Sequence, residues 1–464
     1  MSAAPCAAWR RDVAAIVRIG SPLIVTNVFS IGVAVADTLM AASLGPGALA
    51  AVAIGSGVWI ALFLLGLGTV MALGPTVAQH YGAGQHARIG ADTRQGLWLA
   101  LLVALPVIVA MRSSTPLLRW VGIDEAVIAP AQGYLDLLSW GVPAAYAYHA
   151  FKQMNEGVGS TVPIMTVMAL ALPLNVALNY AFLFGRLGAP ALGAPGCGLG
   201  NAIAFWIMLA MLAFHTLRAP RYRRFEIVTR WDWPQRATQR RLLVLGVPIG
   251  CSLFLQSGLF TTVALLMGAL GTVAVAAHQV VLNYSGLVFM VPLGFGMALT
   301  VCVGQAVGRG DLASAARIGY TGMALCGALS LLAGLTTLLL AGRIAALYTA
   351  DAAVARLAGE LFRIAAFLQI GDGVQVAAAF ALRGLKDTRV PLLLNAFNYW
   401  GIGFVLAWLL GIELGYGAHG IWAGLAVALC TAGVLLIARF RWLTSCRPRT
   451  PPVGPAAVAA GELA

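Results

Sequence analysis

MALGPTVAQHYGAG, residues 71–84, returns at residues 297–310 as MALTVCVGQAVGRG. The same shift of 226 residues carries Gly20 onto Gly246 and Pro22 onto Pro248 without a gap. Later in the chain, three glycines of each half match at nearly the same spacing: Gly193, Gly196 and Gly200 with Gly417, Gly420 and Gly424. In a strongly apolar chain, two such halves predict a transporter whose path runs between them.

The composition is typical of a membrane protein. The 464 residues are 60% hydrophobic and 10% charged, with a mean hydropathy of +0.88, whereas a soluble domain carries about 25% charged residues. Apolar runs of about 20 residues recur, long enough for a helix to cross a bilayer. Hydropathy predicts an all-α membrane protein with twelve transmembrane helices, at roughly 15–42, 48–80, 93–113, 126–150, 161–185, 193–217, 240–266, 272–305, 314–340, 353–382, 388–411 and 417–443.

The repeat divides these helices into two bundles of six. We expect an N-terminal lobe at 1–217, a basic cytoplasmic linker at 218–241, a C-terminal lobe at 242–443 and a disordered tail at 444–464. Because six is an even number, both halves enter the membrane in the same sense. This predicts a parallel repeat about a pseudo-two-fold axis along the membrane normal.

Basic residues gather on one side of the predicted topology. The net charge of +13 could suggest a nucleic-acid partner, but all except six of the 29 lysines and arginines fall in loops on the side of the termini, Lys152 and Arg383 among them. The positive-inside rule therefore predicts a multi-pass protein of a bacterial-type inner (plasma) membrane, with both termini in the cytoplasm. We expect contacts with anionic membrane lipid and no nucleic-acid partner.

Motifs of several other classes are missing from the sequence. The seven cysteines and six histidines form no metal-ligand spacing, and no GxxxxGK[ST] loop is present for ATP. We therefore expect no cofactor, and coupling to a gradient of H⁺ or Na⁺. One charge that crosses 100 mV is worth ~2.3 kcal/mol.

Asp37 is one of two carboxylates that clearly fall inside apolar spans, where a functional role is the default hypothesis. It stands eight residues before Gly45, about 12 Å below the outer loop at 1.5 Å per residue. We expect three amides at similar depth on the fifth and sixth helices: Asn175, Asn179 and Asn201.

Carboxylate and amide oxygens suit a small cation such as Na⁺, which we place at Asp37, Asn175 and Asn179. Burial would also favour a protonated carboxyl group, so that Asp37 could carry H⁺ instead. The alternative is an amide network that only holds helices together. Pro22, in the same helix as Asp37, is the candidate hinge.

Asp372 is the second such carboxylate and lies near mid-membrane, with Gln375 on the adjacent turn. Three amides fall at roughly the same depth on other helices: Gln256, Asn283 and Asn398. We predict that this C-lobe cluster binds substrate or accepts a proton. Val263 stands where the repeat would place a counterpart of Asp37. The two halves are therefore expected to have different roles in transport.

Residues 276–290, AAHQVVLNYSGLVFM, resemble the eighth-helix signature of the multidrug and toxic compound extrusion (MATE) family, NorM-type branch. Further matches are Asp37-Thr38, Pro75-x-x-Ala78-Gln79-x-x-Gly82-Ala83-Gly84, Gly193-x-x-Gly196-Cys197-Gly198, Asp372-x-x-Gln375 and Leu382-Arg383-Gly384-x-Lys386-Asp387. The resemblance covers residues 15–443. It implies a MATE-like fold and cation-coupled export of organic, often cationic, compounds by alternating access.

The resemblance also implies roles for single residues. Asp37, Asn175 and Asn179 match an N-lobe cation or proton site, Asn201 stands where relatives often have Thr, and Asp372 matches the aspartate of the tenth helix. Gln256 and Leu368 stand where sodium-driven relatives carry Glu and Tyr. These departures argue against a C-lobe sodium site and leave H⁺ and Na⁺ open as the coupling ion.

We therefore expect a monomeric antiporter that exports small organic cations, and not an enzyme. A flippase for lipid-linked precursors shares this layout, but such proteins usually line the cleft with basic residues, which the predicted spans almost lack. A membrane-embedded transferase would need clustered acids or an exposed His–Asp pair, and neither appears.

Overall fold

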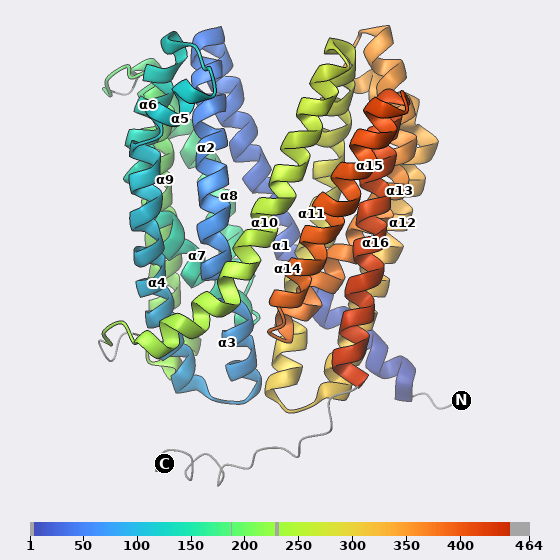
Figure 1. Cartoon of the computed structure of the whole chain (residues 1–464). Coiled ribbons are helices and arrows are strands. Elements are labelled where there is room, and N and C mark those ends of the chain that lie inside the picture. The colour runs from blue at the N-terminus through green and yellow to red at the C-terminus, as the bar shows by residue number, and fades with distance from the viewer. Residues whose placement is uncertain (1–3, 187, 228–231, 446–464) are drawn as a thin grey trace.

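The computed structural model describes residues 4–186, 188–227 and 232–445, and within these ranges the chain is helical and contains no strand (Figure 1). The elements are α1 (Ala4–Ser43), α2 (Pro46–Met71), α3 (Leu73–Gly82), α4 (His86–Arg112), α5 (Thr115–Trp120), α6 (Glu125–Ser139), α7 (Val142–Gly157), α8 (Val162–Phe184), α9 (Ala194–Arg218), η1 (Pro220–Phe225), α10 (Arg236–Ala269), α11 (Thr272–Gly308), α12 (Leu312–Tyr348), α13 (Ala352–Gly384), α14 (Arg389–Ala396), η2 (Phe397–Phe404), α15 (Val405–Trp408), η3 (Leu409–Glu413) and α16 (Gly417–Ser445). The predicted linker at 218–241 contains η1 and the start of α10. Residues 446–464 of the predicted disordered tail lie outside the described residues.

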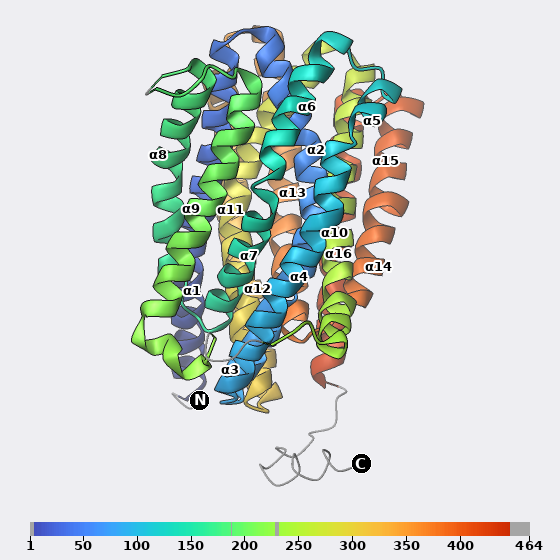
Figure 2. The same cartoon turned by 90° about the vertical axis from the view of Figure 1, so that its left-hand side faces the viewer.

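Eleven helices in the described part of the chain are long and apolar enough to cross a membrane. This confirms the prediction of an all-α membrane protein. The predicted span at 126–150 differs, because the structure divides it into α6 and α7, which follow one another along the bundle (Figure 2). Pro143 lies in the first turn of α7, where its missing N–H needs no partner.

Two bundles stand side by side, α1–α9 and α10–α16 (Figure 1). The first helix of each half begins against the other bundle. Ile16 and Ile19 of α1 share a core with Phe295 of α11, while Leu242 of α10 shares one with Leu99 of α4. Both described chain ends lie at the same end of the molecule, which we call the termini end.

The two bundles are pressed together in the half of the molecule near the termini end. A Cβ atom on Gly82 of α3 would lie 2.8 Å from the carbonyl carbon of Gln305, and one on Gly308 of α11 would lie 2.8 Å from that of Gln79. These two contacts are related by the 226-residue repeat. Close backbone approach of this kind requires glycine.

Two equivalent hydrogen bonds join the bundles at the termini end. Gln79 Nε2 donates to the Gly384 carbonyl oxygen and Gln305 Nε2 to that of Gly157, both at 2.9 Å. Two ion pairs reinforce them from either side: Asp12 with Arg317 at 2.7 Å and Asp92 with Arg241 at 2.8 Å. The duplicated sequence therefore forms a duplicated seal between the bundles.

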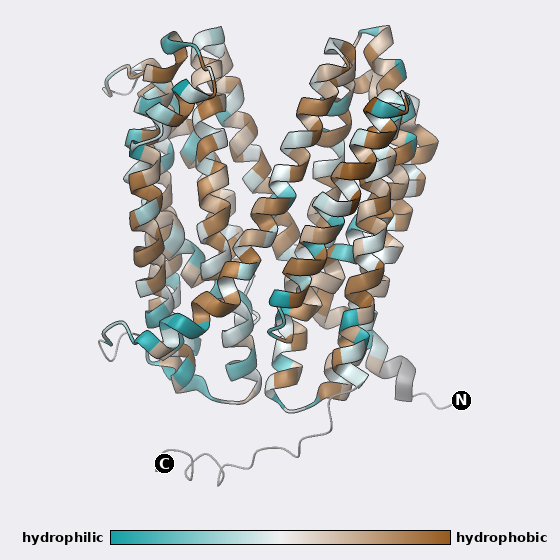
Figure 3. Cartoon of the chain, viewed as in Figure 1, coloured by the Kyte–Doolittle hydropathy of each residue, from teal (hydrophilic) through white to brown (hydrophobic). Residues whose placement is uncertain are grey.

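At the opposite end, where α1 joins α2 and α10 joins α11, the bundles diverge (Figure 1). Cβ atoms built on Gly47, Gly57, Gly268 and Gly286 would meet no atom within 4 Å. Hydrophobic residues dominate the middle of both bundles, and hydrophilic ones gather toward the ends (Figure 3). The two bundles thus pack closely at the termini end and diverge at the other.

Candidate functional site

Asp37 of α1 is held by asparagines from α8 and α9. Asn179 Nδ2 donates to Asp37 Oδ1 at 2.6 Å, and Asn201 Nδ2 donates to Asp37 Oδ2 at 2.9 Å. Asn175 lies one turn before Asn179; its Nδ2 donates to Asn201 Oδ1 at 2.6 Å, and its own Oδ1 accepts from Asn179 at 3.2 Å. All three asparagines are buried. The structure therefore brings together the four residues that the sequence placed at similar depth.

Two of the asparagines act as hydrogen-bond donors to Asp37. Both asparagines that reach Asp37 present N–H groups, so the two carboxylate oxygens are the acceptors at its centre. Asn179 Oδ1 is buried, has no hydrogen-bond partner in the part of the chain that the structure describes, and packs against Gly200, where a Cβ would overlap it. A carboxylate with two N–H donors is stabilised as an anion and keeps lone pairs for a proton.

Pro22 lies inside α1, which runs past it without interruption. The Thr26 hydroxyl donates to the Pro22 carbonyl oxygen at 2.8 Å, and Ser252 repeats this contact with Pro248 at 2.9 Å in α10. Hydroxyl groups that bond back by four residues bend helices slightly. The hinge at Pro22 remains a prediction.

The C-lobe residues that the sequence grouped do not form one cluster. Gln256 and Gln375 both line a cavity between the bundles, and Gln375 Nε2 donates to the Tyr399 hydroxyl at 2.9 Å. Asn398 is buried and donates to the Leu394 carbonyl oxygen of its own helix at 2.7 Å, and Asn283 is exposed. We had expected similar depth to place these amides together, but depth does not determine which face of a helix a side chain occupies.

Asp372 lies on the face of α13 that lines the cavity. It precedes Gln375, Val376, Ala379 and Arg383, which all line the cavity, at the three- and four-residue spacing of one helix face. Its Oδ1 is buried without a hydrogen-bond partner within the described residues. The side chain is thus placed near the cavity with an acceptor still free.

The cavity contains basic residues that hydropathy places in loops. Lys152 lies inside α7 and Arg383 inside α13, and both line the cavity together with His149. The expectation that the cleft holds almost no basic residue was therefore wrong. The error has a physical reason: α7 and α13 continue past the hydrophobic segments that hydropathy detects, so residues beyond those segments are still helical and face inward. The i,i+4 pair of Lys152 with Glu156 was a signal for such a helix.

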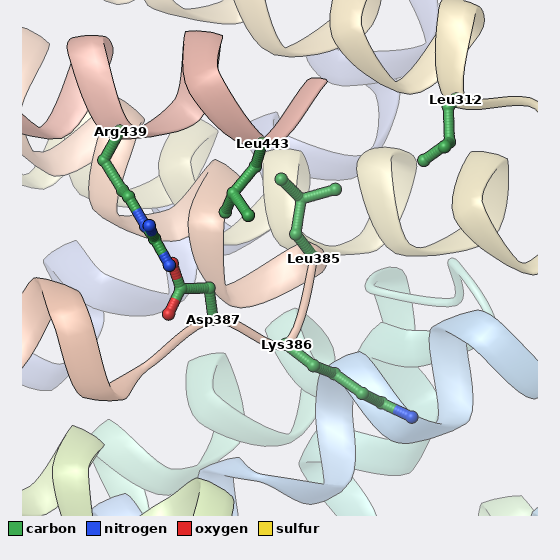
Figure 4. A pocket seen from close by; sticks show the side chains of 6 residues that line it. All are labelled: Leu312, Leu385, Lys386, Asp387, Arg439 and Leu443. Atoms are coloured by element: carbon green, nitrogen blue, oxygen red, sulfur yellow. The ribbon is translucent and has the colours of Figure 1, made fainter. Parts of the chain in front are cut away.

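A second pocket lies at the termini end, lined by Leu312, Leu385, Lys386, Asp387, Arg439 and Leu443 (Figure 4). Arg439 Nε donates to Asp387 Oδ2 at 2.8 Å, whereas Lys386 points away from this pair (Figure 4). Burial and the nearby Arg241 guanidinium lower the pKa of Lys386 from 10.5 to about 8, against the opposing effect of Asp92. Lys386 thus has an amine that is readily deprotonated.

Comparison with known proteins agrees with this geometry. A family model described as MatE matches residues 22–181 and 248–409, which begin at the two equivalent prolines of the repeat. The chain is 38% identical over 435 residues to the multidrug resistance protein PmpM of Pseudomonas aeruginosa, with 93% of this chain and 91% of that protein covered. The chain belongs to the MATE family of transporters, in its NorM-type branch.

Other MATE relatives agree in sequence and in fold. The multidrug resistance protein NorM of Aliivibrio fischeri is 35% identical over 439 residues, with 94% of this chain and 95% of that protein covered. The crystal structure of the eukaryotic MATE transporter AtDTX14 superposes with a TM-score of 0.85 at 19% identity, covering 95% of this chain and 97% of that one. This MATE protein is therefore a multi-pass membrane transporter and not an enzyme.

Proposed function

We propose that this MATE protein is a multidrug efflux antiporter, which exports organic cations in exchange for protons that load onto Asp37. The observation that carries the proposal is the polar cluster around this carboxylate. It lies in an apolar span, in the half of the molecule where the bundles diverge, and three buried asparagines surround it. A charged group in such a place is expensive and marks ion or proton pathways by default.

We take H⁺ as the coupling ion of this proposal. A proton needs one lone pair of one oxygen, which Asp37 offers. Sodium needs several oxygen ligands, so efflux driven by a sodium gradient would identify Na⁺ instead.

We further propose that the termini end faces the cytoplasm, because 23 of the 29 basic residues were expected there. The described conformation would then face outward. Protonation would neutralise Asp37 and weaken its charge-assisted hydrogen bonds to the two asparagines, which would let α1 move relative to α8 and α9. The cargo would leave through the open end, and the protein would act as a monomer among anionic lipids.

The test is efflux of ethidium from proteoliposomes under an imposed pH gradient, and separately under an imposed sodium gradient. We expect the pH gradient to drive efflux and Asp37→Asn to abolish this drive. Asp136→Asn is the matched control, because Asp136 is a partly buried acid of the same lobe that accepts from Gln132 at 2.8 Å, outside the asparagine cluster. Efflux by Asp37→Asn at the parental rate, or efflux driven by sodium alone, would contradict the proposal.

A flippase for lipid-linked precursors is the second candidate. The observation in its favour is the presence of Lys152 and Arg383 in the cavity lining, because such cargo carries phosphate groups that bind cations. Failure of the wild-type protein to move ethidium under either gradient would favour it.

A further inference from the structure

The inner part of the central cavity has an excess of positive charge. Lys152 and Arg383 line the cavity, which has a free volume of about 240 Å³. Glu156 lines an adjoining pocket that shares Gln153, Phe380 and Arg383 with it. These two cations and one carboxylate form what we call the cavity floor, since all lie at the ends of α7 and α13 that face the termini end.

Among the residues that the structure describes, no acidic side chain forms an ion pair with Arg383. Its guanidinium carbon lies 4.2 Å from the centre of the Phe380 ring, and its Nη1 is buried without a hydrogen-bond partner within the described residues. Asp372 is eleven residues earlier on the same helix, which corresponds to about 16 Å at 1.5 Å per residue. That separation is too large for the carboxylate to pair with Arg383.

Lys152 is only loosely paired. Its Nζ lies 3.8 Å from Glu156 Oε1, and the lysine side chain is 10% exposed. Glu156 also accepts from Gln153 Nε2 at 3.2 Å, so its charge is shared between two partners. The floor therefore holds one carboxylate and two cations, and the unmatched charge belongs to Arg383.

A buried guanidinium nitrogen without an acceptor, such as Arg383 Nη1, is costly, and a ligand carboxylate would remove that cost by accepting its N–H groups. The walls above the floor suit an aromatic or otherwise apolar body, because Phe289, Leu293, Met297, Phe380 and Met71 line them. A ligand that carries an acid at one end could therefore bind with this acid at the floor and its apolar part against these walls.

We propose that the cavity floor is a carboxylate-binding subsite built from Arg383 and Lys152. This inference rests on the proposed export function and names the residues that bind an acidic group of the cargo. Arg383 binds the acid of the cargo, and Lys152 adds a second positive charge within the same cavity.

The test compares two dyes that differ in one group. Rhodamine 19 carries a free carboxylate, and rhodamine 6G is its ethyl ester, so both have the same cationic ring system. We measure the efflux of each dye by the wild type, Arg383→Gln, Arg383→Lys and Lys152→Gln. Arg343→Gln is the matched control, because Arg343 is exposed on α12 and lies outside the cavity lining.

We expect Arg383→Gln to lower rhodamine 19 efflux about tenfold or more relative to rhodamine 6G, since hydrogen bonds to charged groups are worth that much. The loss should show as a raised KM for rhodamine 19, with partial recovery in Arg383→Lys. Lys152→Gln should shift the same ratio in the same direction, and Arg343→Gln should leave it unchanged. An equal effect on both dyes in every variant would overturn the subsite.

A binding measurement separates this inference from the proposed function. Fluorescence anisotropy with purified protein reports dye affinity without transport. If the wild type exports neither dye but binds rhodamine 19 more tightly than rhodamine 6G in an Arg383-dependent way, the export function fails and the subsite stands. Equal affinity for both dyes in the wild type would refute the subsite, whatever the transport assay shows.

Discussion

Replacing Gly308 by alanine should weaken the closure of the termini end. In the described state, a Cβ on Gly308 would lie 2.8 Å from the Gln79 carbonyl carbon and would overlap its oxygen. Real Cβ atoms essentially never come within 3.0 Å of another heavy atom of this kind, and the obstacle is backbone, which cannot rotate away. The α3 and α11 helices must therefore separate or strain.

The size of the shift in the closed–open equilibrium follows from the free-energy cost of this steric overlap. One extra methyl group in a well-packed contact costs about 1–3 kcal/mol. If transport opens this end, the strain is present only while the bundles are closed. The variant would then shift the closed–open equilibrium by about five- to 150-fold toward the open form.

Distances between spin labels at Ala87 and Ala313 would measure this shift, in a background without the native cysteines. Both residues are exposed, and the 226-residue repeat relates them across the two bundles. We expect Gly308→Ala to add or enlarge a long-distance population. Gly286→Ala is the control in the same helix, because a Cβ there would meet no atom within 4 Å. Indistinguishable distance distributions for the two variants would refute the reasoning.

Two further predictions concern single contacts. Gly200→Ala should impair proton-driven efflux nearly as much as Asp37→Asn, because its Cβ would overlap Asn179 Oδ1 and displace the asparagine that bonds Asp37. Gly57→Ala is the control and should be active, because no atom lies near its Cβ. Full activity of both variants would argue against a rigid cluster. Lys386 should react with an acylating reagent at half its maximal rate near pH 8, not 10.5, because burial and Arg241 lower its pKa and the neutral amine is the nucleophile. The chain has two lysines, so peptide mass spectrometry can resolve the labelling of Lys386 from that of Lys152, and a midpoint near 10.5 would contradict the prediction.

The N-lobe cluster was predictable because it depends on depth along a helix. Rise per residue is constant, so Asp37, Asn175, Asn179 and Asn201 could be placed at one level from their distances to the loops. A buried charge also requires polar neighbours, and the three asparagines provide them. The prediction of the C-lobe cluster used depth alone; Asn283 is exposed, and Asn398 bonds to the backbone of its own helix.

The cavity floor could not be predicted in the same way. Hydropathy finds the segment of a helix that contacts lipid, and its average falls where charged residues appear. Lys152 and Arg383 were therefore assigned to loops, although α7 and α13 continue through them. The helical face that each residue occupies is decided by packing against other helices, chiefly α4, α9 and α3 for α7 and α11, α12 and α16 for α13. A window along the chain does not sample these contacts.

The sequence by itself determined the membrane class, the helical architecture and the internal repeat, because each depends on local composition or on residue spacing. Tertiary structure alone decided how the two halves meet. Gln79 and Gln305 occupy equivalent positions 226 residues apart, and only the folded protein shows that each donates to the opposite bundle. Contacts between distant segments depend on the relative placement of rigid helices, and that placement comes from the sum of many weak packing terms and not from any single stretch of sequence.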